Sequence, residues 1–182
     1  MDHSALGLVE CRSLALGALV ADGMLKTAGV HLLLAAPVSP GKLLVAIQGG
    51  VAEVEAALEK GLALCEDQLE DALFLPRVHP AVGQALLAPL PETGVEAMGV
   101  VETATVAASL RAADASLKSA RVELLSIRLG AGIGGKAVYH LAGEIADVEA
   151  AVQAGVSAVR IPELLLCSVV LARPHPDYAR YM

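Results

Sequence analysis

The sequence predicts an α+β fold of two tandem βαββαβ halves, in which helices cover one face of each sheet. Three observations support this prediction. The 182 residues suffice for two small domains, each able to bury a core. The second half of the chain repeats the first, and apolar residues recur with helical spacing at matching places in both halves. We therefore expect the order strand, helix, strand, strand, helix, strand to occur twice.

The internal repeat is clearest in two pairs of segments. ALGLVECRS, which starts at Ala5, returns as AMGVVETAT, which starts at Ala97. GKLLVAIQGGVAEVEAAL, from Gly41, returns as GKAVYHLAGEIADVEAAV, from Gly135. The displacement between the copies grows slightly along the chain, which indicates small insertions. A duplicated unit of this kind predicts two domains with the same architecture.

The repeat also indicates the domain boundaries. RVHP, from Arg77, returns as RPHP, from Arg173, near the end of each copy. APLPETGVE lies between the copies, is rich in Pro and acids, and shows no periodic pattern. We expect a first domain at residues 1–88, a linker at 89–96 and a second domain at 97–182.

The first strand of each half is expected where the repeated segments begin, and a helix follows it. Ser13 and Thr105 stand where an N-cap belongs, with an oxygen that can accept a hydrogen bond from a free N–H group. An acid precedes a base by four residues in each helix, as Asp22 with Lys26 and as Asp114 with Lys118. The buried stripe is expected at Leu14, Ala18, Ala21 and Leu25, and again at Val106, Leu110, Ala113 and Leu117.

Two strands and a second helix complete each half. The strands are joined by a loop that ends in Gly-Lys, PVSPGK from Pro37 in the first half and GAGIGGK from Gly130 in the second. The segment KAVYHLAG that follows the second loop alternates in the manner of a strand. The apolar stripe of the second helix is Val51, Val54, Leu58 and Leu62 in one half, and Ile145, Val148, Val152 and Val156 in the other.

The loop GAGIGGK fits two phosphate-binding patterns, GxGxxG and GxxxxGK, but its context excludes both. A P-loop needs Ser or Thr after the Lys to hold magnesium, and Ala137 stands there. Both patterns also need a helix to begin at the loop, whereas a strand is expected. Two explanations of the glycines stay open. Glycine either allows the backbone to approach another group closely, or serves only to form the turn.

Composition and charge exclude several classes of function. A net charge of -7 and an aromatic content of 2% argue against nucleic acid as a partner. The apolar runs are too short for a membrane span, and the N-terminus lacks a signal-peptide core, so we expect a cytoplasmic protein. Cys11, Cys65 and Cys167 lack CxxC spacing and are expected to be reduced thiols in the core.

The sequence shows no catalytic or metal-binding constellation. None of the five histidines has HxxxH spacing, so we predict no metal site and no enzymatic activity. His140 lies in an alternating strand and is expected to be a packed or an edge histidine rather than a ligand. Glu10 and Glu102 occupy matching strand ends, where we expect hydrogen bonds to nearby backbone rather than acid–base chemistry.

Four landmarks recur in the same order in both halves, and together they resemble the tandem-domain shell proteins of bacterial microcompartments. They are a Lys that ends the first helix (DGMLK, DASLK), the Gly-Lys loop (SPGK, IGGK), the start of the second helix (GGVAEVEAA, GEIADVEAA) and the Arg-x-His-Pro sequence. The resemblance covers nearly the whole chain, with the elements in unpermuted order. It implies shell (BMC) domains of ferredoxin-like fold.

This resemblance implies a structural shell protein in a cytoplasmic microcompartment. Three chains with two domains each would form a flat pseudohexameric trimer, and such tiles would meet other shell proteins edge to edge around encapsulated enzymes. A central pore would pass small polar or anionic metabolites. The resemblance assigns the pore lining to Val38, Ser39, Pro40 and Gly41 in the first half and to Gly132, Ile133 and Gly134 in the second.

The resemblance also implies edge contacts and raises the question of a cofactor. The residues expected at tile edges are Lys26, Lys118, Arg77, Arg173, His79 and His175, with each Arg beside a Lys. Ordinary solvated charges are the alternative for the lysines. Some relatives of this type hold an iron–sulfur cluster through a Cys in the first pore turn, where this chain has Ser39. We therefore expect no cluster, because a hydroxyl is a poor substitute for a thiolate.

A second class of function fits the same fold. Trimeric split-βαβ proteins can bind small molecules in clefts between subunits, so a ligand-binding sensor is the alternative to a shell tile. A tile should form sheets or tubes at high concentration, whereas a sensor should remain a discrete trimer and melt at a higher temperature with its ligand.

Overall fold

The computed structural model describes residues 5–86 and 96–175, which fall into two compact units. Unit 1 comprises Met1–Val78 together with Gly130–Gly135, and unit 2 comprises His79–Leu129 and Lys136–Met182. Each unit contains one four-stranded antiparallel sheet. The predicted α+β class with two βαββαβ halves is confirmed.

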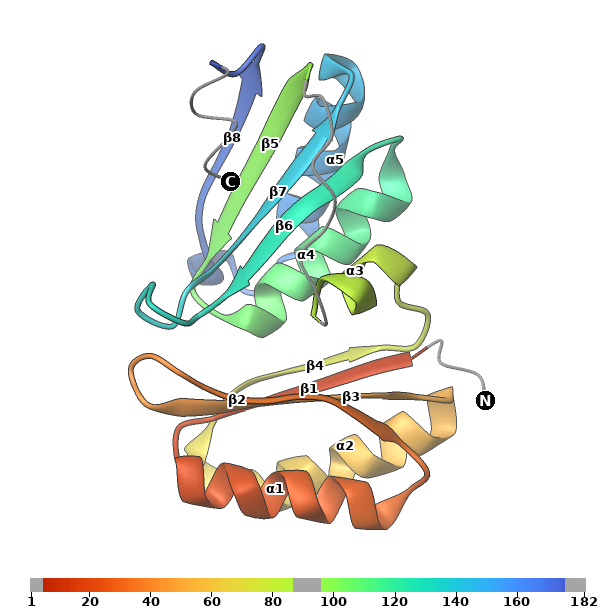
Figure 1. The fold of residues 1–182 in the computed structure, drawn as a ribbon, viewed down its shortest axis with the longest axis vertical. Helices are drawn as coiled ribbons and strands as arrows, with labels where there is room; N and C mark the ends of the chain where they lie inside the picture. Colours follow the sequence, from red (N-terminus) through yellow and green to blue (C-terminus); the bar gives the residue numbers. More distant parts are fainter. Residues whose placement is uncertain (1–4, 87–95, 176–182) are drawn as a thin grey trace. The chain divides into compact units, whose positions relative to one another are not determined.

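Unit 1 contains the first βαββαβ half, with its strands in the order β2-β3-β1-β4. Helices α1 and α2 lie side by side on one face of the sheet (Figure 1). The elements are β1 (Ala5–Cys11), α1 (Leu14–Thr27), β2 (His31–Val38), β3 (Lys42–Gly49), α2 (Val51–Cys65) and β4 (Leu69–Leu75), with a short 3-10 turn at Glu66–Gln68.

Unit 2 repeats this arrangement, with strands in the order β6-β7-β5-β8 and helices α4 and α5 packed together on the sheet. The elements are β5 (Ala97–Thr103), α4 (Val106–Ser119), β6 (Glu123–Leu129), β7 (Ala137–Gly143), α5 (Ile145–Ala158) and β8 (Leu165–Ala172), with a 3-10 turn at Pro162–Leu164. A further short helix, α3 (Pro80–Ala85), packs against α4 and β6. It lies inside the range 1–88 that we assigned to the first domain, yet it groups with unit 2.

The predicted helix starts are confirmed in both halves. The Ser13 Oγ accepts a hydrogen bond from the Leu16 N–H at 3.2 Å, and the Thr105 Oγ1 accepts one from the Ala108 N–H at 3.2 Å. These bonds satisfy donors that would otherwise have no partner in the first helical turn. The acid–base pairs at four-residue spacing also form, at 2.7 Å in α1 and 2.6 Å in α4.

Of the predicted stripe of α1 only Ala21 is buried, because the helix is rotated relative to that stripe. Leu14, Ala18 and Leu25 are exposed, and the residues that face the core are Gly17, Val20, Ala21 and Met24. A Cβ added at Gly17 would lie 2.6 Å from the Leu43 Cβ, so the helix approaches the sheet through its smallest residue. In α4 the predicted residues Val106, Leu110, Ala113 and Leu117 are all buried.

The cysteines divide into two environments. Cys11 and Cys65 are buried in the core between the helices and the sheet of unit 1, as predicted. Cys167 is exposed on β8, so its predicted core position is wrong. In the described part of the chain, no helix is both long and apolar enough to cross a membrane.

Candidate functional site

The first of the two predicted pore turns joins β2 to β3 and comprises Val38, Ser39, Pro40 and Gly41. The Gly41 N–H donates a hydrogen bond to the Val38 carbonyl at 2.9 Å, which closes the turn. The Ser39–Pro40 peptide bond is cis, and Gly41 has a φ of 124°, a value that requires glycine. Val38 is buried, Ser39 is half-buried, and Pro40 and Gly41 are exposed.

The second turn joins β6 to β7 and is formed by glycines in left-handed conformations. Gly130, Gly132, Gly134 and Gly135 have φ values of 71°, 73°, 68° and 81°. The N–H groups of Ile133 and Gly135 donate to the Gly130 carbonyl at 3.4 and 3.2 Å. An added Cβ at Gly132 or Gly134 would meet nothing within 4 Å among the described residues, so the positive φ explains glycine there.

The position of this turn also bears on the phosphate-binding patterns. β7 begins at Ala137, directly after Lys136, and α5 begins only at Ile145. The loop therefore presents no helix N-terminus to a phosphate, as predicted. The segment Gly130–Gly135 belongs to unit 1, and so does the turn Val38–Gly41.

The lysine after each turn forms an ion pair with an acid on the first strand of its half. The Lys42 Nζ lies 2.5 Å from the Glu10 Oε2, and both side chains are buried. The Lys136 Nζ lies 3.1 Å from the Glu102 Oε1, with side chains 51% and 36% exposed. We expected the two acids to bond to backbone and missed both pairs. The sequence signal was a Glu on the first strand and a Lys after the Gly-rich turn at matching positions of both halves; the strands that carry or follow them prove to be paired.

The predicted edge lysines lie in the last turns of α1 and α4. The Lys26 Nζ donates to the Asp22 Oδ2, and both side chains are largely exposed. The Lys118 Nζ donates to the Asp114 Oδ2, a carboxylate whose side chain is only 8% exposed. Each lysine therefore forms the same kind of ion pair within its own helix, but Asp114 is much more deeply buried than Asp22.

The other predicted edge residues follow the last strand of each half. Arg77 is exposed in the turn after β4, and His79 is the N-cap of α3, where its Nδ1 accepts from the Ala81 N–H at 3.3 Å. Arg173 has a φ of 52°, and its N–H donates to the Glu96 carbonyl at 2.8 Å. Arg173 and His175 are both exposed.

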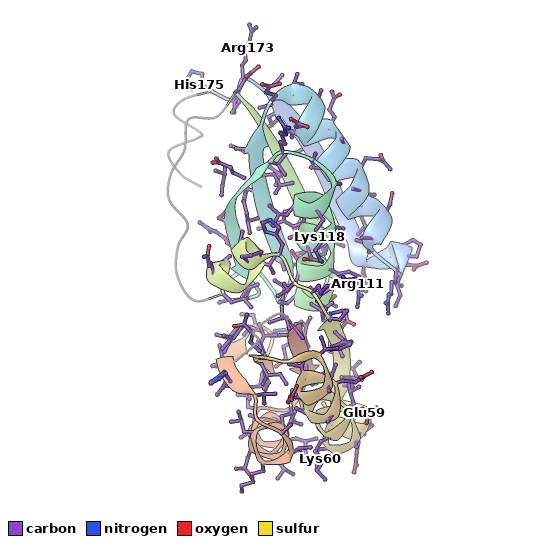
Figure 2. The ribbon with its side chains drawn as sticks, turned by 90° about the vertical axis from the view of Figure 1, so that its right-hand side faces the viewer. Glu59, Lys60, Arg111, Lys118, Arg173 and His175 are labelled. Atoms are coloured by element: carbon purple, nitrogen blue, oxygen red, sulfur yellow. The ribbon has the colours of Figure 1, made fainter. Side chains whose placement is uncertain are left out.

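In unit 2, His79 and Lys118 both bond to Asp114, whereas Figure 2 shows that Arg173 and His175 are not brought to Lys118. Arg173 and His175 lie at one end of the unit, and Lys118 lies well away from them. An Arg beside a Lys, as the resemblance implies, therefore cannot arise between these residues of a single unit 2.

Cys65 and His140 are buried titratable groups with shifted pKa values. Burial raises the pKa of the Cys65 thiol to about 12, and a hydrogen bond with Cys11 adds to the shift. His140 is packed, as predicted, with its Nδ1 2.9 Å from the Ser126 Oγ. Burial, and then the charge of Arg128, lower the pKa of its imidazole. Within residues 5–86 and 96–175, no cluster of three His, Cys, Asp or Glu side chains could hold a metal ion.

Comparison with known proteins gives a consistent picture. The BMC domain family matches residues 5–78 and 97–174, which correspond to the two repeats. The chain is 37% identical to the bacterial microcompartment shell protein PduT of Citrobacter freundii, over 98% of this chain and 97% of that protein. The shell protein EutM of Escherichia coli is 39% identical over 85 residues, which cover 46% of this chain and 84% of EutM.

A solved structure supports the same assignment. The crystal structure of a microcompartment protein from Desulfitobacterium hafniense superimposes with a TM-score of 0.90 and 41% identity, over 98% of this chain and 99% of that one. The resemblance inferred from the four repeated landmarks is thereby confirmed. The chain belongs to the BMC-domain family and carries two copies of the domain in tandem.

Proposed function

We propose that this protein is a structural shell protein of a bacterial microcompartment and that three copies form one pseudohexagonal tile. The observation that carries the proposal is the occurrence of the same βαββαβ unit twice in one chain. Three chains therefore supply six similar units, enough to close a ring about a threefold axis. The similarity to the shell protein PduT along the whole chain supports the shell role.

The two glycine-containing turns are the proposed lining of a pore at the centre of the tile. Their exposed residues carry little side-chain bulk, as Pro40, Gly41, Gly132 and Gly134 show. The N–H groups of Gly41, Ile133 and Gly135 bond within the turns, and the remaining main-chain N–H groups of such turns can favour anions. We therefore infer an opening for small polar or anionic metabolites.

The pore is proposed to carry no iron–sulfur cluster. The three cysteines stand at positions 11, 65 and 167, and none of them lies in either turn. Ser39 offers a hydroxyl where such a cluster needs a thiolate. Purified protein is expected to contain no stoichiometric iron and to be colourless. A brown preparation with iron in proportion to trimer would contradict this expectation.

The protein is also proposed to act without catalysis, with other shell proteins as its edge partners. The exposed Lys26 at the end of α1 is a candidate for contact with a neighbouring tile, and Lys118 is its counterpart in α4. One kind of contact can then be used repeatedly around the tile edge.

Two measurements test the proposal. Sedimentation equilibrium should give three times the chain mass of 18.6 kDa, and electron microscopy of concentrated protein should show sheets or tubes with a hexagonal repeat. A monomer would contradict the tile. A discrete trimer that never assembles, and whose melting temperature rises with one specific small molecule, would favour a sensor instead.

A further inference from the structure

Within unit 2, one carboxylate fastens the end of the first repeat to helix α4. The main-chain N–H of His79 donates to the Asp114 Oδ1 at 2.7 Å, and α3, which His79 caps, packs against α4 and β6 (Figure 1). The other oxygen of Asp114 accepts from the Lys118 Nζ at 2.6 Å. Asp114 of α4 thus bonds to His79, which belongs to the segment RVHP that follows β4.

The matching carboxylate of the first repeat, Asp22, has no such segment against it among the described residues. Asp22 and Lys26 in α1 occupy the places of Asp114 and Lys118, and the same ion pair forms between them. The Asp22 side chain is nevertheless 55% exposed, whereas that of Asp114 is 8% exposed.

The apolar residues around the two carboxylates differ in the same direction. Leu14 and Leu25 of α1 are 46% and 38% exposed. Their counterparts in α4, Val106 and Leu117, are 0% and 7% exposed. α1 therefore presents exposed leucines and a carboxylate on a surface that corresponds to a buried surface of α4. Exposed apolar side chains grouped in this way are typical of an interaction site.

The sequence repeat identifies a segment that fits this surface. RPHP, from Arg173, repeats RVHP, and it follows β8 as RVHP follows β4. The counterpart of His79 is therefore His175, which is exposed. The observed contact runs from the end of the first repeat to the first helix of the second. The equivalent contact would join the end of the second repeat of one copy to the first helix, α1, in the first repeat of another copy.

We propose that Asp22 of one copy accepts a hydrogen bond from the main-chain N–H of His175 of a second copy, with the leucines of α1 covered by that copy. This inference rests on the proposed trimer, in which the contact is made three times and closes the ring. Lys26 holds the Asp22 carboxylate in position, as Lys118 holds Asp114. Asp22 is then a contact between copies within one tile.

The test uses two substitutions that remove opposite sides of one bond. Asp22→Ala removes the acceptor, and His175→Pro removes the main-chain donor because proline has no N–H. Sedimentation equilibrium in a urea series gives the trimer dissociation constant for each single variant, for the double variant and for the control Glu59→Ala. Glu59 is an exposed acid on α2, so the control changes the net charge equally (Figure 2).

Each single substitution is expected to raise the dissociation constant about tenfold or more, because a hydrogen bond to a charged group is lost. The dissociation constant of the double variant should not exceed that of the single variant with the higher value, since both changes remove the same bond. Glu59→Ala should behave as the unchanged protein. Circular dichroism should show the same secondary structure in all variants.

Three results would overturn the inference while leaving the proposed tile intact. These are a wild-type trimer that neither substitution weakens, effects that add fully in the double variant, and a loss of thermal stability at an unchanged dissociation constant. The last result would place the contact within one chain. A wild-type monomer would instead refute the tile itself.

Discussion

The two Glu-Lys pairs beside the turns should contribute very differently to the free energy of unfolding. Glu10 and Lys42 are buried together, whereas Glu102 and Lys136 are partly exposed. Removal of one partner from a buried pair leaves a charge without compensation in a region of low dielectric constant. Exposed pairs contribute little, because water screens them.

Glu10→Gln is therefore expected to lower the free energy of unfolding by about 3–5 kcal/mol. Glu102→Gln, the matched control in the second half, should lower it by about 0–1 kcal/mol. Urea unfolding at one fixed protein concentration measures both. Equal losses for the two variants would show that burial does not distinguish the pairs.

The left-handed glycines of the second turn should resist substitution for conformational reasons. Gly132→Ala is expected to cost about 1–2 kcal/mol, because alanine is strained at a φ of 73° even where its Cβ meets no other atom. Gly29→Ala is the control, since Gly29 is also exposed with open space around it but has no such φ. A similar shift in the unfolding midpoint for both variants would contradict this explanation.

His140 should make stability depend on pH. Its pKa in the folded protein is lowered from 6.5, so the unfolded chain binds a proton more readily. Its contribution is complete above about pH 6.5 and is lost as the pH falls towards and through the lower folded value. His140→Ala, which introduces the residue found at the matching position 46, should reduce the loss of stability between pH 7 and pH 5. An unchanged pH profile would show that other groups dominate.

At the scale of the elements, the order of strands and helices was predictable from the repeat and from helical periodicity. The orientation of α1 was not, because its leucines suggest a buried stripe that the packing of Gly17 against Leu43 overrides. α3 was missed, since six residues are too few to show a periodic pattern. The buried pair of Glu10 and Lys42 depends on strand register, which the sequence did not reveal.

The close approach of α1 to β3 gives a prediction with its own internal control. Gly17→Val places a side chain where an added Cβ already lies 2.6 Å from the Leu43 Cβ, and it should cost about 1–3 kcal/mol or more. Ala18→Val introduces the same residue at the next, exposed position without the clash. Because valine is a poorer helix former than alanine and a better one than glycine, helix propensity alone would make Ala18→Val the more costly change. The difference between their unfolding midpoints measures the contact. Equal midpoints would mean that the helix shifts without cost.

At the scale of the whole molecule, two BMC domains in one chain lead to a prediction about assembly. Lys26→Ala combined with Lys118→Ala should abolish sheets and tubes in electron micrographs while the trimer persists in sedimentation experiments. The pair of Lys26 with Asp22 is exposed and contributes only about 0.2–0.5 kcal/mol. Lys118 pairs with the nearly buried Asp114, which keeps the hydrogen bond from the His79 N–H when Lys118 is replaced. Glu59→Ala with Lys60→Ala, two exposed residues of α2, is the control. Sheets from the double lysine variant would exclude these residues as edge contacts.

The proposed roles of the pore turns and edge residues could be predicted from the sequence only through resemblance to a family. These roles depend on contacts with other copies, which a single chain does not contain. Local chemistry was easier to foresee. The caps at Ser13 and Thr105, the acid–base pairs of α1 and α4, and the strand that follows the second glycine loop were all predicted from short-range rules, and the structure confirms them.

The unequal turns after β2 and β6 have a further consequence for variation. If a proposed six-unit tile were built from chains with one domain each, the same loop would occur six times around the axis, so any substitution there would occur at all six places. In the proposed tile of this chain the Ser39–Pro40 turn and the glycine-rich turn would alternate, so a mutation in one turn would leave the three copies of the other unchanged. The charge or width of the proposed pore could then be changed at three turns at a time, while the three turns of the other kind keep the pore open.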